Sequence, residues 1–184
     1  SAYRELETRY YAGEGAASKI RRATVSTVGS LFCQRASFVP ERVALEDAST
    51  GRSRTYAEVR DRTSRLASFL ASRHVTRGSR VAVLSENRSE YLEVFLAAAR
   101  LGAIVACQNW RLAPPEILHC LDLVEPACVF VSERHAGVLP SKYDRHAIAF
   151  GDAFEVAIAS YPRVFFDVVG DVEPEDQFFI LYTS

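Results

Sequence analysis

Two hydroxyl residues, Thr183 and Ser184, directly follow an apolar run at 178–182 that has the character of a β-strand. A strand that delivers hydroxyl side chains to its carboxyl end often leads into a turn that binds phosphate. The same residue types also serve ordinary turns in every fold class, because their side chains bond to nearby backbone groups. The pattern alone therefore leaves a phosphate-binding turn and a plain structural turn both open.

The sequence contains no other complete catalytic signature. It has no Walker loop, no dinucleotide-binding glycine fingerprint, no zinc-protease helix and no serine in a nucleophile elbow. We expect the histidines to be surface or packing residues and the cysteines to be reduced and mostly buried, with no catalytic residue and no metal site in the chain. The residues concerned are His74, His119, His135, His146, Cys33, Cys107, Cys120 and Cys128.

The elements that must position this strand end follow an alternating pattern. From residue 80 onward, apolar strand-like runs alternate with amphipathic helical segments, and the run at 81–84 is apolar throughout, as in a strand covered on both faces. This alternation predicts an α/β fold with a mostly parallel sheet, right-handed crossovers and helices on both faces. Strands are expected at 43–45, 81–84, 103–108, 127–132, 146–150, 163–169 and 177–182, and helices at 27–39, 55–73, 87–102, 114–124 and 152–160.

Several helix boundaries have local signals. Thr55 with Glu58, and Asn87 with Glu90, have the spacing of capping boxes, and Gly102 stands where a left-handed residue ends a helix. Helical spacing predicts that 55–73 and 87–102 each bury one apolar side, while the arginines of 55–73 face outward or sideways. The predicted apolar positions are Val59, Leu66, Phe69, Leu70, Tyr91, Leu92, Val94, Phe95, Ala98 and Leu101, and the arginines are Arg60, Arg62 and Arg65.

Composition limits the possible functions. With 184 residues and 48% hydrophobic content, the chain suits one globular core, and residues 1–27 form an uninformative lead-in segment. The 22 basic and 23 acidic residues balance, so we expect no nucleic-acid partner. No run reaches the roughly 18 apolar residues of a membrane helix and no signal peptide is present, so we expect no membrane span and a cytoplasmic protein. The absence of methionine and the strand at the chain end suggest a segment of a longer polypeptide.

Several separate blocks, in order, resemble the amino-terminal region of acyl-CoA synthetases, which are AMP-binding, adenylate-forming ligases. The resemblance covers residues 28–184 and is loosest at 133–176. Most residues in these blocks are structural, but their order and spacing are specific. The blocks are Thr55-Tyr56-Ala57-Glu58 to Leu70, Gly78 to Val83, Asn87-Arg88-Ser89-Glu90-Tyr91, Phe95 to Ala103, Gln108-Asn109-Trp110-Arg111-Leu112-Ala113-Pro114-Pro115-Glu116, and Leu181-Tyr182-Thr183-Ser184.

The resemblance implies that Thr183 and Ser184 begin the loop that holds the phosphates of ATP, continuing as Gly-Thr-Thr-Gly-x-Pro-Lys-Gly. It implies a longer enzyme that uses ATP, Mg²⁺ and coenzyme A to convert a small-molecule carboxylic acid, through an acyl-adenylate, into a thioester. The remaining motifs of the family would lie downstream. Residues 1–184 would then be part of the amino-terminal domain, inactive alone and without a bound cofactor.

Other functions remain open. The chain could belong to an adenylation domain that loads a carrier protein, to a luciferase-like oxidase, or to a non-catalytic doubly wound binding module. The block at 109–112 favours a coenzyme A product, although Trp110 in that block could simply pack between the strand end and the helix at Pro114. If the chain is part of a ligase, we expect it to self-associate through apolar surfaces that the rest of the enzyme would cover.

Overall fold

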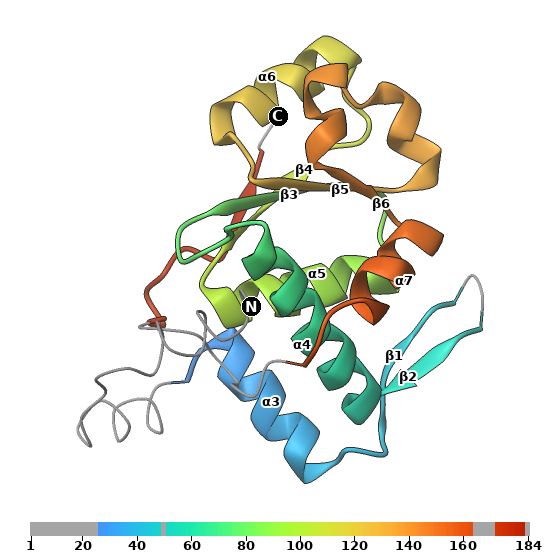
Figure 1. Cartoon of the computed structure of the whole chain (residues 1–184), viewed down its shortest axis with the longest axis vertical. Helices are drawn as coiled ribbons and strands as arrows, with labels where there is room; N and C mark the ends of the chain where they lie inside the picture. Colours follow the sequence, from blue (N-terminus) through green and yellow to red (C-terminus); the bar gives the residue numbers. More distant parts are fainter. Residues whose placement is uncertain (1–25, 49–50, 164–171, 183–184) are drawn as a thin grey trace.

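The computed structural model describes residues 26–48, 51–163 and 172–182. At its centre is a sheet with the strand order β6-β5-β3-β4-β7, in which all neighbouring strands are parallel (Figure 1). This confirms the predicted parallel α/β architecture. The strands are β3 (Arg80–Leu84), β4 (Ile104–Gln108), β5 (Cys128–Val131), β6 (Ala147–Ala149) and β7 (Phe179–Leu181).

Helices cover both faces of this sheet (Figure 1). One face packs on α4, α5 and α7 through a core that includes Val81, Val83 and Phe130, and α3 packs on α4 and α5. The opposite face packs on α6 and η2 through a second core that includes Leu84 and Val129. The helices are α3 (Val28–Phe38), α4 (Tyr56–Ser72), α5 (Ser89–Leu101), α6 (Pro114–Val124), α7 (Asp152–Ala159) and the short 3₁₀ helices η1 (Glu133–Val138) and η2 (Ser141–His146).

A small antiparallel hairpin precedes α4. Its strands are β1 (Val43–Glu46) and β2 (Ser53–Thr55), and β1 agrees with the strand expected at 43–45. Thr55 closes β2 and caps α4: its hydroxyl accepts a hydrogen bond from the Glu58 amide, and the Glu58 carboxylate accepts one from the Thr55 amide. This reciprocal cap confirms the predicted capping box and fixes the hairpin against the helix.

The start of α5 differs from the prediction. Arg88 is the N-cap residue and no side chain caps the helix, so the expected capping box at Asn87 is wrong. The Glu90 carboxylate accepts hydrogen bonds from the Arg88 guanidinium and the Ser89 hydroxyl, and these bonds occupy the group that a capping box needs. The end of α5 agrees with the prediction, because Gly102 has a φ of 64°.

Most of the predicted buried sides are confirmed, with three differences. Leu92, expected in the core, is 49% exposed at the edge of α5. Helical spacing in α3 groups Val28, Leu31, Phe32 and Arg35 on one face, but the helix instead packs through Gly29, Cys33 and Ala36, because Gly29 lies directly on the backbone of α5. Arg62, expected on an outer or lateral face, instead bonds to the buried Glu93 carboxylate.

Two further expectations concern the rest of the chain. The strand predicted at 163–169 falls almost entirely outside the described residues. Among the helices that the structure does describe, none combines the length and the apolar content needed to cross a bilayer.

Candidate ligand-binding site

A pocket of about 900 Å³ lies at the carboxyl ends of β3, β4 and β7. Its floor is formed by Ser85 after β3, by Gln108 and Asn109 at the end of β4, and by Leu181 and Tyr182 at the end of β7. The tip of the β1–β2 hairpin forms one side and the first two turns of α5 form another. Three strands that are far apart in sequence therefore deliver residues to one cavity.

The topology of the sheet explains why a cavity forms here. Strand β3 leads into α5 on one face, whereas the neighbouring strand β4 leads into α6 on the opposite face. The two connections diverge and leave a crevice between the strand ends, which is where open α/β sheets bind their ligands. The pocket is therefore at the expected ligand position for this fold class.

Both apolar and charged side chains line the pocket. The apolar ones include a stacked pair of aromatic rings, Tyr91 and Phe95, with centroids 5.5 Å apart. The charged ones include both positive and negative groups. The apolar lining residues are Leu45, Tyr91, Leu92, Phe95 and Leu181, and the charged ones are Glu46, Asp47, Arg88 and Arg111.

The charge of Arg88 is fixed by its neighbours. Hydrogen bonds to Glu90 raise the pKa of the Arg88 guanidinium, against an opposing effect of burial. Burial alone would raise the pKa of Glu90, but bonds from Arg88, the Glu90 amide and Ser89 together hold that pKa below its usual value. The pair is thus ionised at neutral pH, at the point where α5 meets the pocket.

One thiol lies in the pocket wall. Cys107 is half-buried in β4 and is bonded to the Tyr91 hydroxyl. Burial raises the pKa of the Cys107 thiol, so it remains protonated at neutral pH and is a poor nucleophile. The other three cysteines are buried and all four are free, as predicted.

The turn after β4 contacts both the pocket and the core beneath α6. Trp110 lines the pocket and also packs against the core beneath α6. Its ring stacks on the buried His135 rather than packing only against the helix at Pro114. His135 is therefore a packing residue, while His74, His119 and His146 are exposed.

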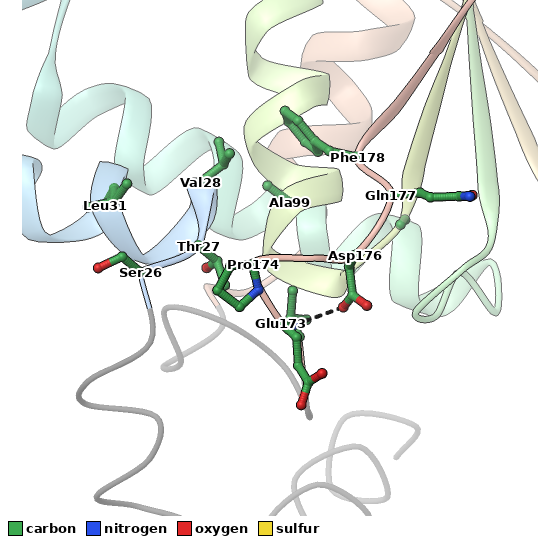
Figure 2. A pocket seen from close by; sticks show the side chains of 13 residues that line it. Ser26, Thr27, Val28, Leu31, Ala99, Glu173, Pro174, Asp176, Gln177 and Phe178 are labelled. Atoms are coloured by element: carbon green, nitrogen blue, oxygen red, sulfur yellow. Dashed lines mark hydrogen bonds between the residues drawn. The ribbon is translucent and has the colours of Figure 1, made fainter.

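A second, smaller pocket of about 150 Å³ lies at the amino-terminal side of β7. Figure 2 shows its lining from the start of α3, the end of α5 and the segment that leads into β7. In that segment the Glu173 amide donates a hydrogen bond to the Asp176 carboxylate. A Cβ atom on Gly102 would lie 2.9 Å from a side-chain methyl group of Val172, so the glycine leaves room for this side chain against the end of α5.

The two hydroxyl residues singled out in the sequence, Thr183 and Ser184, lie outside the described residues. Tyr182, which immediately precedes them, lines the large pocket. Gln108, a buried polar residue at the end of β4, also lines the pocket, although the sequence analysis assigned it no role in a site. Within the described part of the chain, no group of three or more histidine, cysteine or acidic residues is arranged to hold a metal ion.

Comparison with known proteins identifies relatives of this architecture. Residues 32–184 match the family model described as AMP-binding enzyme. The chain is 31% identical over 160 residues to a 3-oxocholest-4-en-26-oate–CoA ligase of Rhodococcus rhodochrous, a match that covers 79% of this chain and 28% of the ligase. It is 32% identical over 160 residues to a 2-succinylbenzoate–CoA ligase of Geobacillus kaustophilus, covering 87% of this chain and 31% of the ligase.

Solved structures agree with the sequence matches. The N-terminal domain of FACL13 from Mycobacterium tuberculosis superimposes with a TM-score of 0.75 and 28% identity, over 86% of this chain and 42% of that domain. The chain thus spans less than a third of the two ligases that it matches in sequence.

Proposed function

This chain belongs to the family of AMP-binding enzymes, and from that membership we propose that it is the amino-terminal part of an ATP-dependent carboxylate–CoA ligase. The pocket formed by three strand ends carries the proposal, because β7 leads from its floor directly to Thr183 and Ser184. The two relatives compared above by sequence are both named as CoA ligases, which supports coenzyme A as the acceptor.

The proposed reaction has two steps. A carboxylate oxygen of the substrate attacks the α phosphorus of ATP, forming an acyl-adenylate and releasing pyrophosphate. The thiol of coenzyme A then attacks the acyl carbon, loses its proton and displaces AMP, which leaves a thioester. Positioning of the reactants and neutralisation of charge at the phosphoryl centre supply the catalysis of the first step.

In this proposal Thr183 and Ser184 open the loop that binds the ATP phosphates. Hydroxyls and backbone amides at the end of a parallel strand suit phosphate oxygens, and glycines that follow would permit a close backbone approach. The coding sequence beyond codon 184 tests this directly. We expect Gly-Thr-Thr-Gly-x-Pro-Lys-Gly, and a different sequence or a stop codon would contradict the loop.

Magnesium would accompany ATP in such an enzyme. The described residues contain no group of three or more histidine, cysteine or acidic side chains arranged to hold a metal ion, and we assign none of them to magnesium.

We further propose that residues 1–184 form a partial amino-terminal domain that is inactive alone. Its exposed apolar residues next to the pocket support this view: Phe179 and Leu181 on β7 are 51% and 64% exposed, beside Leu92 on α5. Exposed apolar groups at a sheet edge favour association. Sedimentation of the isolated chain should show self-association, and a monodisperse monomer at high concentration would contradict this.

The identity of the acceptor is testable in the intact protein. Incubation with ATP, coenzyme A and a panel of fatty and aromatic acids should give an acyl-CoA detectable by mass spectrometry. Transfer only to a carrier protein would instead indicate an adenylation domain. The absence of ATP-dependent chemistry with any acid would favour a non-catalytic doubly wound binding module.

A further inference from the structure

The β1–β2 hairpin forms one side of the large pocket, yet it has no core of its own. Residues 45–48 line the pocket, and none of the hairpin residues that the structure describes is buried. The strands have four and three residues, and an isolated two-stranded hairpin is at best marginally stable. Contacts with the rest of the fold must therefore hold this side of the pocket in place.

The base of the hairpin is held by bonds to the backbone. The Tyr56 amide donates to the Arg42 carbonyl at 2.9 Å, and the Thr55 hydroxyl caps α4. These contacts lie at one end of the hairpin, whereas the pocket-lining residues 45–48 lie toward its other end. A hairpin held only at its base is free to pivot, so a second anchor is needed nearer the pocket.

Arg54 supplies this second anchor. It stands opposite Leu45 in the β1–β2 register, so both side chains project from the same face of the hairpin. The Arg54 side chain is only 11% exposed and reaches two helices. Its Nε lies 3.5 Å from Oε1 of Glu93 in α5, and its Nη2 lies 3.7 Å from Oε1 of Glu155 in α7. A single side chain thus joins the hairpin to two helices of the main fold.

Charge explains why a second arginine belongs at this point. Arg62 donates to both Glu93 and Glu155, at 2.7 Å in each case. Without Arg54, that one guanidinium would face two carboxylates, and the Glu93 side chain is fully buried. Burial raises the pKa of Glu93, and the charges of Arg62 and Arg54 oppose that effect. Arg54 therefore balances the second carboxylate, which favours the docked position of the hairpin.

The docked hairpin presents apolar and acidic groups to the pocket. Leu45 is apolar, like the aromatic pair of α5 that lines the same pocket, whereas Glu46 and Asp47 are acidic. An apolar lining suits a carbon skeleton, and acidic side chains repel phosphates. Figure 1 shows the hairpin and β7 on opposite sides of the molecule. The hairpin side of the pocket therefore suits the carbon skeleton of an acid better than ATP.

We propose that Arg54 is a positioning residue that holds the β1–β2 hairpin as the wall against which the carbon skeleton of the carboxylic acid lies. This role rests on the proposed ligase function. Residues 45–48 line the pocket and Arg54 does not, within the described part of the chain. Arg54 therefore acts on the acid through Leu45 and its neighbours rather than by direct contact.

Kinetics of the intact protein test this role, with the acid that the wild type activates best. Arg54→Leu should raise the KM for that acid in pyrophosphate exchange by about three- to tenfold, as expected when apolar contact is partly lost. The KM for ATP and kcat should stay close to the wild-type values. Leu45→Ala, a change in the wall itself, should raise the same KM. Arg54→Lys keeps the charge and should recover most of the affinity for the acid.

Arg42→Leu removes the same charge at an exposed site near the base of the hairpin, and it is the control that should change neither KM. Two results for Arg54→Leu would overturn the proposal. One is an unchanged KM for the acid. The other is an equal rise in both KM values together with a lower melting temperature, because that pattern marks a residue that only stabilises the fold. If Arg54→Leu does not fold, an unchanged KM for the acid in Leu45→Ala overturns the proposal instead.

A wild-type protein without exchange activity would reject the ligase function, and deuterium uptake of the intact protein then decides the anchoring role separately. Arg54→Leu should speed uptake at hairpin amides such as that of Asp47, which donates to the Arg52 carbonyl at 2.9 Å, and leave β3 and β4 unchanged. Arg54→Lys should restore the slow uptake. Equal uptake in the hairpins of Arg54→Leu and the wild type, or faster uptake throughout the sheet, would overturn the anchoring role.

Discussion

The indole ring of Trp110 stacks on the imidazole ring of His135, with centroids 5.0 Å apart and planes inclined by 23°. The guanidinium of Arg111 lies 4.2 Å from the centroid of the same indole. The His135 ring nitrogen Nε2 is 3.3 Å from the Glu86 carboxylate, without an aligned hydrogen bond. The turns after β3, β4 and β5 are thus joined beside the pocket.

Fluorescence reports directly on this stack, because Trp110 is the single tryptophan of the chain. His135→Ala should move the emission maximum to longer wavelength and increase quenching by acrylamide, since the indole loses the ring that covers it. His119→Ala, at an exposed position on α6, is the matched control and should change neither property. Identical spectra for both variants would show that the stack does not shield the indole.

The aromatic cluster on the α4 side of the sheet should dominate the stability. Phe130 is fully buried in β5 and contacts the rings of Phe69, Phe150 and Phe154. Phe130→Ala should lower the free energy of unfolding in urea by about 3–5 kcal/mol. Leu123→Ala, at a position 65% exposed, should stay within about 0.5 kcal/mol of the wild type. A loss below about 1 kcal/mol for Phe130→Ala would contradict the packing described here.

The buried ion pair between Arg62 of α4 and Glu93 of α5 predicts that substitutions of the two residues have non-additive effects on the free energy of unfolding. Arg62 donates to both oxygens of Glu93, at 2.7 and 2.8 Å, and also to Glu155 of α7. Glu93→Leu should cost about 3–5 kcal/mol, because it leaves the half-buried guanidinium with one partner fewer. The double variant Arg62→Leu with Glu93→Leu should recover most of that loss. Equilibrium unfolding of the wild type, of Arg62→Leu, of Glu93→Leu and of the double variant measures the coupling, and a double variant as unstable as the sum of the single ones would refute it.

Acid should weaken the contact between α4 and α7. Hydrogen bonds from Arg62 hold the pKa of Glu155 below its usual value. A carboxyl group whose pKa is lowered by folding stabilises the protein above its unfolded pKa of about 4.3, and this stabilisation is lost as the pH falls through the folded pKa. The difference in stability between wild type and Glu155→Gln should therefore be full at neutral pH and shrink below about pH 4. Urea unfolding at several pH values measures this difference in stability, and a difference that grows on acidification would contradict the prediction.

The sheet and most helices follow from local patterns. Continuous apolar runs predicted β3 and β4, and the Thr55–Glu58 spacing predicted the start of α4, because these signals involve neighbouring residues. The role of Arg62 was missed. Its partners Glu93 and Glu155 lie 31 and 93 residues further along the chain, so helical periodicity marked it only as polar.

The candidate site was the harder part to predict. Gln108 stands at a strand end with no distinctive neighbours, and its bond to Tyr182 depends on the register between β4 and β7, across 74 residues of sequence. Leu92 was assigned to the core by spacing alone, although the pocket opens beside it. Segment 133–146 folds into two 3₁₀ helices, whose short turns leave no periodic apolar pattern.

Carboxylate-dependent exchange of labelled pyrophosphate into ATP tests the central claim most directly. The intact protein, assayed with magnesium and a panel of carboxylic acids, should incorporate label only when an acid that it activates is present. Residues 1–184 alone should incorporate none. Exchange by the intact protein would establish acyl-adenylate formation, whereas its absence with every acid, in a folded protein that carries the complete loop, would contradict the ligase function.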